Sequence, residues 1–155
     1  MSTAIHRKGP SAPCRWLYKH GYICNGYIDP ATMRERAGLD YGCGHGADCD
    51  FLGWLGWDPV HRRAGAYLVD AQFRAVTCTY VLNVIRGKGR RAGILRHLDH
   101  ITEQGGDIFV TVRRDLKVPS QNTSRGYQVD VPDHELTNSG YTKIRETAGY
   151  PYSGG

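Results

Sequence analysis

The chain alternates short apolar runs with stretches of helical periodicity. The apolar runs are rich in β-branched and aromatic residues, which predicts buried strands at residues 38–41, 54–57, 73–85 and 108–112. The clearest amphipathic pattern predicts a helix over residues 90–104, ended by Gly105-Gly106, with His97 and His100 on its water-facing side. Four apolar side chains share its inner face: Ile94, Leu95, Leu98 and Ile101. Strands that alternate with helices are typical of an α/β domain built on a parallel sheet.

Weaker patterns complete the expected fold. Ser11 can cap a helix over residues 11–20 that has Pro13 in its first turn, after a polar and flexible arm at residues 1–10. The less regular segments predict a helical turn at 31–36, a reduced strand at 66–69, a polar loop at 119–126, a strand at 127–131, a short helix at 133–138 and a last strand of the sheet at 141–147.

Bulk composition bounds the class of protein. The 155 residues are enough for one domain with its own core, which we place at residues 11–155, and 40% of them are hydrophobic, as in globular proteins. No apolar run approaches the roughly 18 residues that span a bilayer, and the polar N-terminus lacks a signal core, so we expect a cytoplasmic protein. The five cysteines are odd in number, which favours reduced thiols over a disulfide framework.

The most informative segment is Leu-Asp-Tyr-Gly-Cys-Gly-His-Gly at residues 39–46. Its pattern predicts a strand and then a glycine turn that opens onto a helix, where backbone groups can approach a ligand closely. Asp58 follows Gly42 by 16 residues, near the roughly 20-residue spacing at which a carboxylate meets ribose hydroxyls. The segment therefore predicts a site for a nucleoside-containing cofactor.

Two cofactor classes fit these glycines. Gly42, Gly44 and Ala47 also match the dinucleotide fingerprint G-x-G-x-x-A, so NAD remains an alternative. Asp40, two positions before Gly42, would repel a pyrophosphate but attract a cationic ligand. S-adenosylmethionine (SAM) carries an ammonium and a sulfonium group beside its ribose, so Asp40 favours SAM.

The pattern Asp-x-Gly-x-Gly-x-Gly at residues 40–46 resembles motif I of the class I SAM-dependent methyltransferases. Residues 73–85 look like the fourth strand and motif IV of that family, and residues 105–115 look like its fifth strand with the preceding turn. Over residues 11–147 the chain is similar to small, poorly characterised methyltransferase-like proteins of bacteria and their phages. The resemblance implies a three-layer Rossmann-like class I methyltransferase sheet, in a minimal version with a short second-strand region.

The same resemblance implies roles for individual residues. Asp40 would hold the methionine ammonium, and Asp58 would accept hydrogen bonds from the ribose hydroxyls. Tyr80 and Asn83 follow the fourth strand and are the expected catalytic, acceptor-facing residues. The other expected members of the cofactor site are Tyr41, Gly42, Cys43, Gly44, Pro59, Cys78, Thr79 and Tyr80. The nucleic-acid amino-methylase tetrad (Asn or Asp, Pro, Pro, aromatic) is absent after this strand, which disfavours methylation of an exocyclic base amine.

The formal charge of +5 leaves the methyl acceptor open between a nucleic acid and a small molecule. Basic residues after the predicted strand ends form either a rim that attracts RNA or DNA, or an ordinary solvated surface: Arg86, Lys88, Arg90, Arg91, Arg113 and Arg114. A metal site at Cys43, His45 and Cys49 would lack the usual fourth ligand, so no metal is expected. Two other functions stay open: a SAM-binding protein without transferase activity, and a basic nucleic-acid-binding protein that has lost its cofactor.

Overall fold

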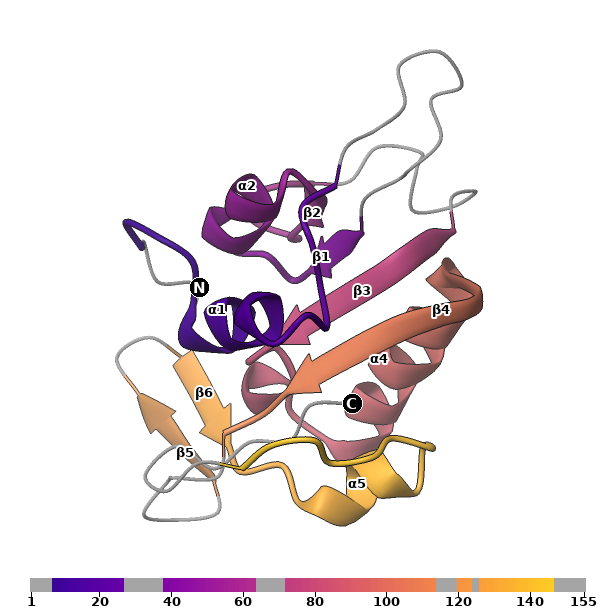
Figure 1. The fold of residues 1–155 in the computed structure, drawn as a ribbon. Coiled ribbons are helices and arrows are strands. Elements are labelled where there is room, and N and C mark those ends of the chain that lie inside the picture. Colours follow the sequence, from indigo (N-terminus) through magenta and orange to yellow (C-terminus); the bar gives the residue numbers. More distant parts are fainter. Residues whose placement is uncertain (1–6, 27–37, 64–71, 114–119, 124–125, 147–155) are drawn as a thin grey trace.

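The computed structural model describes residues 7–26, 38–63, 72–113, 120–123 and 126–146, which are coloured in Figure 1. The predictions for residues 31–36, residues 66–69, Arg114 and most of the N-terminal arm lie outside this part of the chain. Among the described residues, no helix is both long enough and apolar enough to cross a bilayer.

Four parallel strands form the central sheet: β1 (Leu39–Tyr41), β2 (Leu55–Trp57), β3 (Phe73–Thr79) and β4 (Thr102–Thr111). Their order across the sheet is β2-β1-β3-β4. The register places Asp40 of β1 between Gly56 of β2 and Thr77 of β3. The parallel pairing confirms the predicted α/β class, and the second strand is short, as expected.

Helices cover both faces of this sheet, which confirms the three-layer arrangement (Figure 1). They are α1 (Ala12–Lys19), α2 (Ala47–Leu52), α4 (Lys88–Ile101) and α5 (Asp133–Thr137). Leu98 of α4 and Leu136 of α5 belong to the larger core cluster on one face, together with Val76 of β3. Leu17 of α1 and Leu52 of α2 belong to a smaller cluster on the other face. Because both faces are buried, the strands have the near-continuous apolar runs seen in the sequence.

The start of α1 is fixed by the cap that the sequence predicts. Ser11 Oγ accepts a hydrogen bond from the Cys14 N–H at 3.3 Å, and Pro13 lies in the first turn. The N–H and Oγ of Ser11 also donate to the two carboxyl oxygens of Asp48, at 2.6 and 2.7 Å. These two bonds hold the start of α1 against α2, beside the glycine turn.

The third apolar run forms a shorter strand than expected. β3 ends at Thr79, whereas the pattern extends to Ile85. Tyr80 has a φ of 60°, which turns the backbone out of the sheet, and a 3-10 helix, η1 (Leu82–Val84), follows. The apolar residues after Thr79 therefore belong to a turn that packs on the end of the strand. Hydrophobic periodicity alone cannot tell such a buried turn from a continued strand.

The boundary between α4 and β4 also differs from the prediction. The helix ends at Ile101 rather than Gln104, and Thr102 already has extended backbone angles. Thr102 pairs with Phe73, and the ladder resumes between Ala75 and Asp107 after an irregularity. Pairing with β3 thus extends β4 back through Gly105-Gly106, which the sequence had suggested as a helix end.

The C-terminal part does not complete the main sheet as expected. β5 (Ser120–Thr123) and β6 (Gly126–Val129) form a separate antiparallel pair, so residues 120–123 are a strand rather than part of a polar loop. Residues 141–146 follow α5 without strand pairing, which corrects the predicted last strand over its described part. The two strands of an antiparallel pair hydrogen-bond to each other and need no place in the main sheet. The polar composition of this segment gives no apolar pattern from which that pairing could be predicted.

Candidate functional site

The sheet has a topological switch point between β1 and β3. From β1 the chain passes through α2 to β2 on one side, while β3 lies on the other side of β1 and leads through α4 to β4. α2 and α4 lie on opposite faces of the sheet. In open α/β sheets, ligands bind at the carboxyl ends of the strands beside such a point. The glycine turn follows β1, and Tyr80 follows β3, so both border the expected crevice.

The glycine turn adopts a backbone that side chains disfavour. Gly42, Gly44 and Gly46 have φ values of 73°, 57° and 90°. A Cβ on Gly42 would overlap the side chain of Val81, so the turn packs directly on the segment that follows β3. The two sides of the switch point are therefore in contact through a position that only glycine can fill.

Several N–H groups of this turn are bonded within the chain. The N–H groups of Gly42 and Cys43 both donate to the Trp57 carbonyl, at 2.7 and 2.9 Å. The Gly44 N–H donates to Asp58 Oδ2 at 3.0 Å. These three N–H groups hold the turn against the end of β2, so they are not available to a ligand. The turn's contribution to a ligand site is close backbone approach.

Asp58 stands at the carboxyl end of β2 and faces the glycine turn. Besides Gly44, its carboxylate accepts hydrogen bonds from the N–H groups of Val60 and His61, at 2.9 and 3.0 Å. Burial by itself would raise the pKa of Asp58, but the donors from His61, Val60 and Gly44 outweigh it and hold the pKa below its ordinary value. A carboxylate has about four acceptor positions, so with three donors among the described residues one position remains for a hydroxyl group. The neighbouring Pro59 is exposed.

Asp40 lies in a buried cluster of carboxyl groups. Only 3% of Asp40 is exposed, and its Oδ1 accepts a hydrogen bond from Thr77 Oγ1 at 3.0 Å. Its Oδ2 has no hydrogen bond within the part of the chain that the structure describes. Burial and then the nearby Asp48 carboxyl raise the pKa of Asp40 well above its ordinary value. The Thr77 hydrogen bond and the positive charge of Arg7 oppose this shift only in part, so the two buried acids still suit a further cationic ligand.

The sequence did not indicate that three other residues belong to this cluster: Thr77, Asp48 and Ser11. Thr77 could have been found, because it is the cross-strand neighbour of Asp40 on the same face of the sheet. Asp48 and its partner Ser11 could not, because 37 residues separate them and only the packing of α1 on α2 brings them together.

Two predicted pocket residues turn their side chains into the core. Tyr41 and Cys78 both belong to the cluster under α4, and burial raises the pKa of each of them. The Tyr41 hydroxyl lies 3.0 Å from Nδ1 of His97, which therefore does not face water as predicted, whereas His100 is exposed. Only the backbones of Tyr41 and Cys78 can border the crevice, and Thr79 stands half-buried at its edge.

Tyr80 adopts a strained backbone at the end of β3. Among the described residues it alone has a positive φ without being glycine, and its N–H donates to the Thr111 carbonyl at 2.9 Å. A bulky residue in the left-handed region costs of the order of 1–3 kcal/mol, and such strain clusters at functional sites. The side chain is half-buried beside the switch point.

Asn83 has a structural task that the sequence did not suggest. Both of its amide N–H groups are used, since Nδ2 donates to the carbonyls of Arg113 and Val129 at 2.7 and 2.8 Å. Its Oδ1 accepts from the Arg113 N–H at 2.8 Å, and the residue is 2% exposed. Asn83 thus joins η1 to the ends of β4 and β6, so Tyr80 remains as the acceptor-facing candidate.

The predicted basic rim is smaller than expected. Arg91 is buried and forms a two-pronged ion pair with Glu135, with both N–O distances at 2.8 Å, so it cannot meet a polyanion. The Arg86 guanidinium lies over the Tyr127 ring, 4.2 Å from its centroid. Lys88 and Arg90 are exposed, and Arg113 is half-buried.

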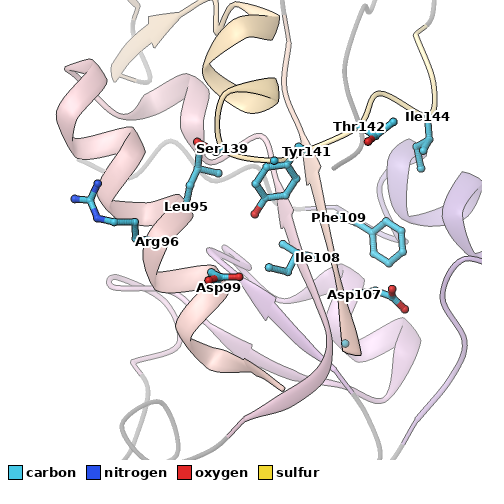
Figure 2. Close-up of a pocket in the computed structure, with 12 residues that line it drawn as sticks. Leu95, Arg96, Asp99, Asp107, Ile108, Phe109, Ser139, Tyr141, Thr142 and Ile144 are labelled. Carbon is cyan, nitrogen blue, oxygen red and sulfur yellow. The ribbon is translucent and has the colours of Figure 1, made fainter. Parts of the chain in front are cut away.

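A separate cavity of about 570 Å³ lies along the outer edge of β4, between α4 and residues 139–144 (Figure 2). Leu95, Ile108 and Tyr141 supply its apolar part, and Asp99 lies at its border. The cavity opens beside the middle of β4 rather than at the carboxyl ends of the strands. It is therefore distinct from the crevice at the switch point.

Comparison with known proteins gives a distant structural likeness. No protein-family model matches the chain, and no curated protein matches it. The crystal structure of magnesium protoporphyrin IX methyltransferase from Synechocystis PCC 6803 with bound SAM is similar at a TM-score of 0.49 and 15% sequence identity, covering 92% of this chain and 74% of that chain. At this level of similarity, neither the ligand nor the substrate of that enzyme transfers to this chain.

Proposed function

We propose that the protein binds SAM at the switch point between β1 and β3 and transfers its methyl group to an acceptor. The observation that carries this proposal is the bond from the Gly44 N–H to Asp58. It brings a carboxylate at the end of β2 to the glycine turn at the end of β1, where a ribose would be recognised.

The residues present fit SAM better than a dinucleotide. The ammonium of SAM would take the place beside Asp40 Oδ2, which has no hydrogen bond within the described residues, and would offset the repulsion from Asp48. The remaining acceptor position of Asp58 would serve a ribose hydroxyl. A pyrophosphate would bring negative charge toward Asp40 and Asp48, which are both buried, and this is unfavourable at low dielectric.

The protein's contribution to the chemistry is positioning. SAM supplies an electrophilic methyl group on a good leaving group, so alignment of the acceptor provides much of the catalysis. Gly42 and Val81 fix the distance between the two sides of the crevice, and the Tyr80 backbone ends β3 there. Tyr80 is the residue that we assign to orienting the acceptor or taking its proton.

A polyanionic acceptor is supported by the surface next to Tyr80. Six residues after Tyr80, Arg86 lies over Tyr127, and exposed Lys88 and Arg90 follow at the start of α4. Because α4 runs antiparallel to the strands, its first turn lies at the carboxyl edge of the sheet. Aromatic rings next to arginine and lysine suit an unpaired nucleic-acid strand, so we propose single-stranded RNA or DNA ahead of a small molecule.

A SAM-binding protein without transferase activity is the second candidate function. It is favoured by Asn83, whose amide is spent on the backbones of Arg113 and Val129. This leaves Tyr80 as the only catalytic residue of the two that the sequence had suggested.

A methyl-transfer assay separates the two candidates. The wild-type protein, incubated with methyl-labelled SAM and a pool of single-stranded oligonucleotides, should label the nucleic acid. Tyr80→Phe should reduce labelling, and K88Q/R90Q should weaken nucleic-acid binding while SAM affinity is unchanged. Binding of SAM with no labelling of RNA, DNA or a small-molecule panel would favour the non-catalytic function.

A further inference from the structure

Two cysteine side chains lie together beneath the glycine turn. Cys43 belongs to the turn, and Cys49 is the third residue of α2. A Cβ on Gly56 would lie 2.6 Å from Cys49 Sγ and 2.9 Å from Cys43 Sγ, so both sulfurs occupy the space over one backbone position of β2. The Cys43 thiol donates to the Gly44 carbonyl at 3.6 Å, and the Cys49 thiol donates to the Gly46 carbonyl at 3.3 Å, so the backbone of the turn orients both sulfurs.

The surroundings distinguish the two thiols. The neighbouring Cys43 side chain lowers the pKa of Cys49 against the effect of its burial, and the Arg62 guanidinium, whose Nη1 lies 3.5 Å from Cys49 Sγ, lowers it further. The neighbouring Cys49 side chain and burial raise the pKa of Cys43. Cys49 is fully buried, whereas Cys43 is half-buried. Of the two thiols, Cys49 therefore loses its proton more readily, whereas Cys43 is the sulfur that a small oxidant reaches.

We propose that Cys43 and Cys49 form a peroxide-sensitive dithiol, and that its disulfide ties the glycine turn to α2. Cys43 passes its proton to Cys49 and attacks the O–O bond of hydrogen peroxide, which gives a Cys43 sulfenic acid and hydroxide. The hydroxide takes the proton back from Cys49 and becomes water. The Cys49 thiolate then attacks the Cys43 sulfur, forms the S–S bond and expels a second hydroxide.

The disulfide would act on the ligand site through the turn. The Cys43 N–H is bonded to the Trp57 carbonyl at 2.9 Å, and the next N–H, on Gly44, is bonded to Asp58. Pulling the Cys43 side chain toward α2 disturbs both bonds, so oxidation lowers the affinity for SAM. This consequence rests on the proposed function, whereas formation of the disulfide does not.

Peptide mapping tests the dithiol directly. Trypsin releases residues 37–62 as one peptide whose only cysteines are Cys43 and Cys49, because no lysine or arginine lies between Arg36 and Arg62. After peroxide, unfolding in urea and iodoacetamide, this peptide should be two hydrogens lighter and carry no alkyl group, while Cys14, Cys24 and Cys78 are alkylated. Alkylation of both Cys43 and Cys49 in peroxide-treated protein would overturn the proposal.

Single variants test the order of the two steps. Cys49→Ser removes both the proton acceptor and the resolving thiol, so Cys43 should oxidise more slowly than in the wild type and accumulate as a sulfenic acid that dimedone traps. Cys43→Ser should leave Cys49 reduced. Cys14→Ser, which changes another buried thiol of the same core cluster, should form the disulfide like the wild type. Dimedone labelling of Cys49 in the Cys43→Ser protein would contradict the order of attack.

Titration calorimetry with SAM tests the link to the ligand site. Peroxide should weaken SAM binding in the wild type, dithiothreitol should restore it, and Cys43→Ser should not respond. Equal affinities in both states would overturn the link. Disulfide formation in a protein that binds no SAM in either state would overturn the proposed function and leave the dithiol standing.

Discussion

The Asp58 carboxylate and the Gly44 N–H are joined by a hydrogen bond of 3.0 Å. This bond connects the end of β2 to the turn after β1, and two further backbone donors, Val60 and His61, fix the same carboxylate. A side chain that the sequence marks as a ribose ligand therefore also organises the turn on which that ligand would lie.

Asp58→Asn should weaken SAM binding, because an amide replaces one of the two acceptor oxygens. The expected loss is about 1.5–3 kcal/mol for one charge-assisted hydrogen bond, which is at least tenfold in affinity by calorimetry. Asp50→Asn is the matched control, since it removes a carboxylate that pairs with Arg62 at 2.8 Å and is largely exposed. Equal losses in the two variants would contradict a direct role for Asp58.

Asp40→Asn should make the protein more stable near neutral pH. Because the pKa of Asp40 is raised, the contribution of this group to stability is fully present below its ordinary pKa of 3.8 and is lost as pH rises through the folded-state pKa. Asparagine keeps the acceptor for Thr77 and carries no charge, so its advantage in melting temperature should grow with pH. Asp48→Asn, which disrupts the bonds from Ser11, should be destabilising instead. If the difference in melting temperature between Asp40→Asn and the wild type did not vary with pH, the raised pKa of Asp40 would be contradicted.

Gly42→Ala should destabilise the protein more than Gly21→Ala does. Both glycines have positive φ, at 73° and 79°, so both alanines carry backbone strain. Only the alanine at position 42 also overlaps Val81, because a Cβ on Gly21 meets nothing within 4 Å. In urea denaturation, Val81→Ala should remove the excess cost of Gly42→Ala. Equal losses for the two single variants would mean that the turn and the β3 end are not in contact.

Arg91→Met should be strongly destabilising, by about 3–5 kcal/mol, because it leaves Glu135 buried without its partner. The two side chains are each 8% exposed and join α4 to α5. Arg74→Met, which removes an exposed pair with Glu103 at 3.7 Å, should change stability by no more than about 1 kcal/mol. A double variant, Arg91→Met with Glu135→Leu, should recover much of the loss. Denaturant midpoints of these proteins test the buried pair.

The sequence predicts the parts of the fold that depend on local chemistry. The glycine turn, the Ser11 cap and the short second strand need only backbone preferences and periodicity, and the structure has each of them. Asp58 was placed beside the turn by its spacing alone. The unpredicted features depend on contacts between distant segments.

Arg91 and Asn83 illustrate that limit. A sequence shows an arginine in a basic run, but only the packing of α5 on α4 turns Arg91 inward to Glu135, 44 residues away. Asn83 follows an apolar strand, the position expected of an active-site amide. Its Nδ2 group instead donates to the backbone carbonyls of Arg113 and Val129, which come from two later segments of the chain. The same holds for the end of α4, where pairing with β3 overrides the helical pattern after Ile101.

Titration calorimetry of the reduced protein with SAM, S-adenosylhomocysteine and NAD tests the central claim most directly. The site at the switch point predicts micromolar binding of SAM, binding of S-adenosylhomocysteine, no heat with NAD, and loss of SAM binding in Asp40→Asn. Tight binding of NAD, or no binding of either sulfur nucleoside by the folded wild type, would contradict it.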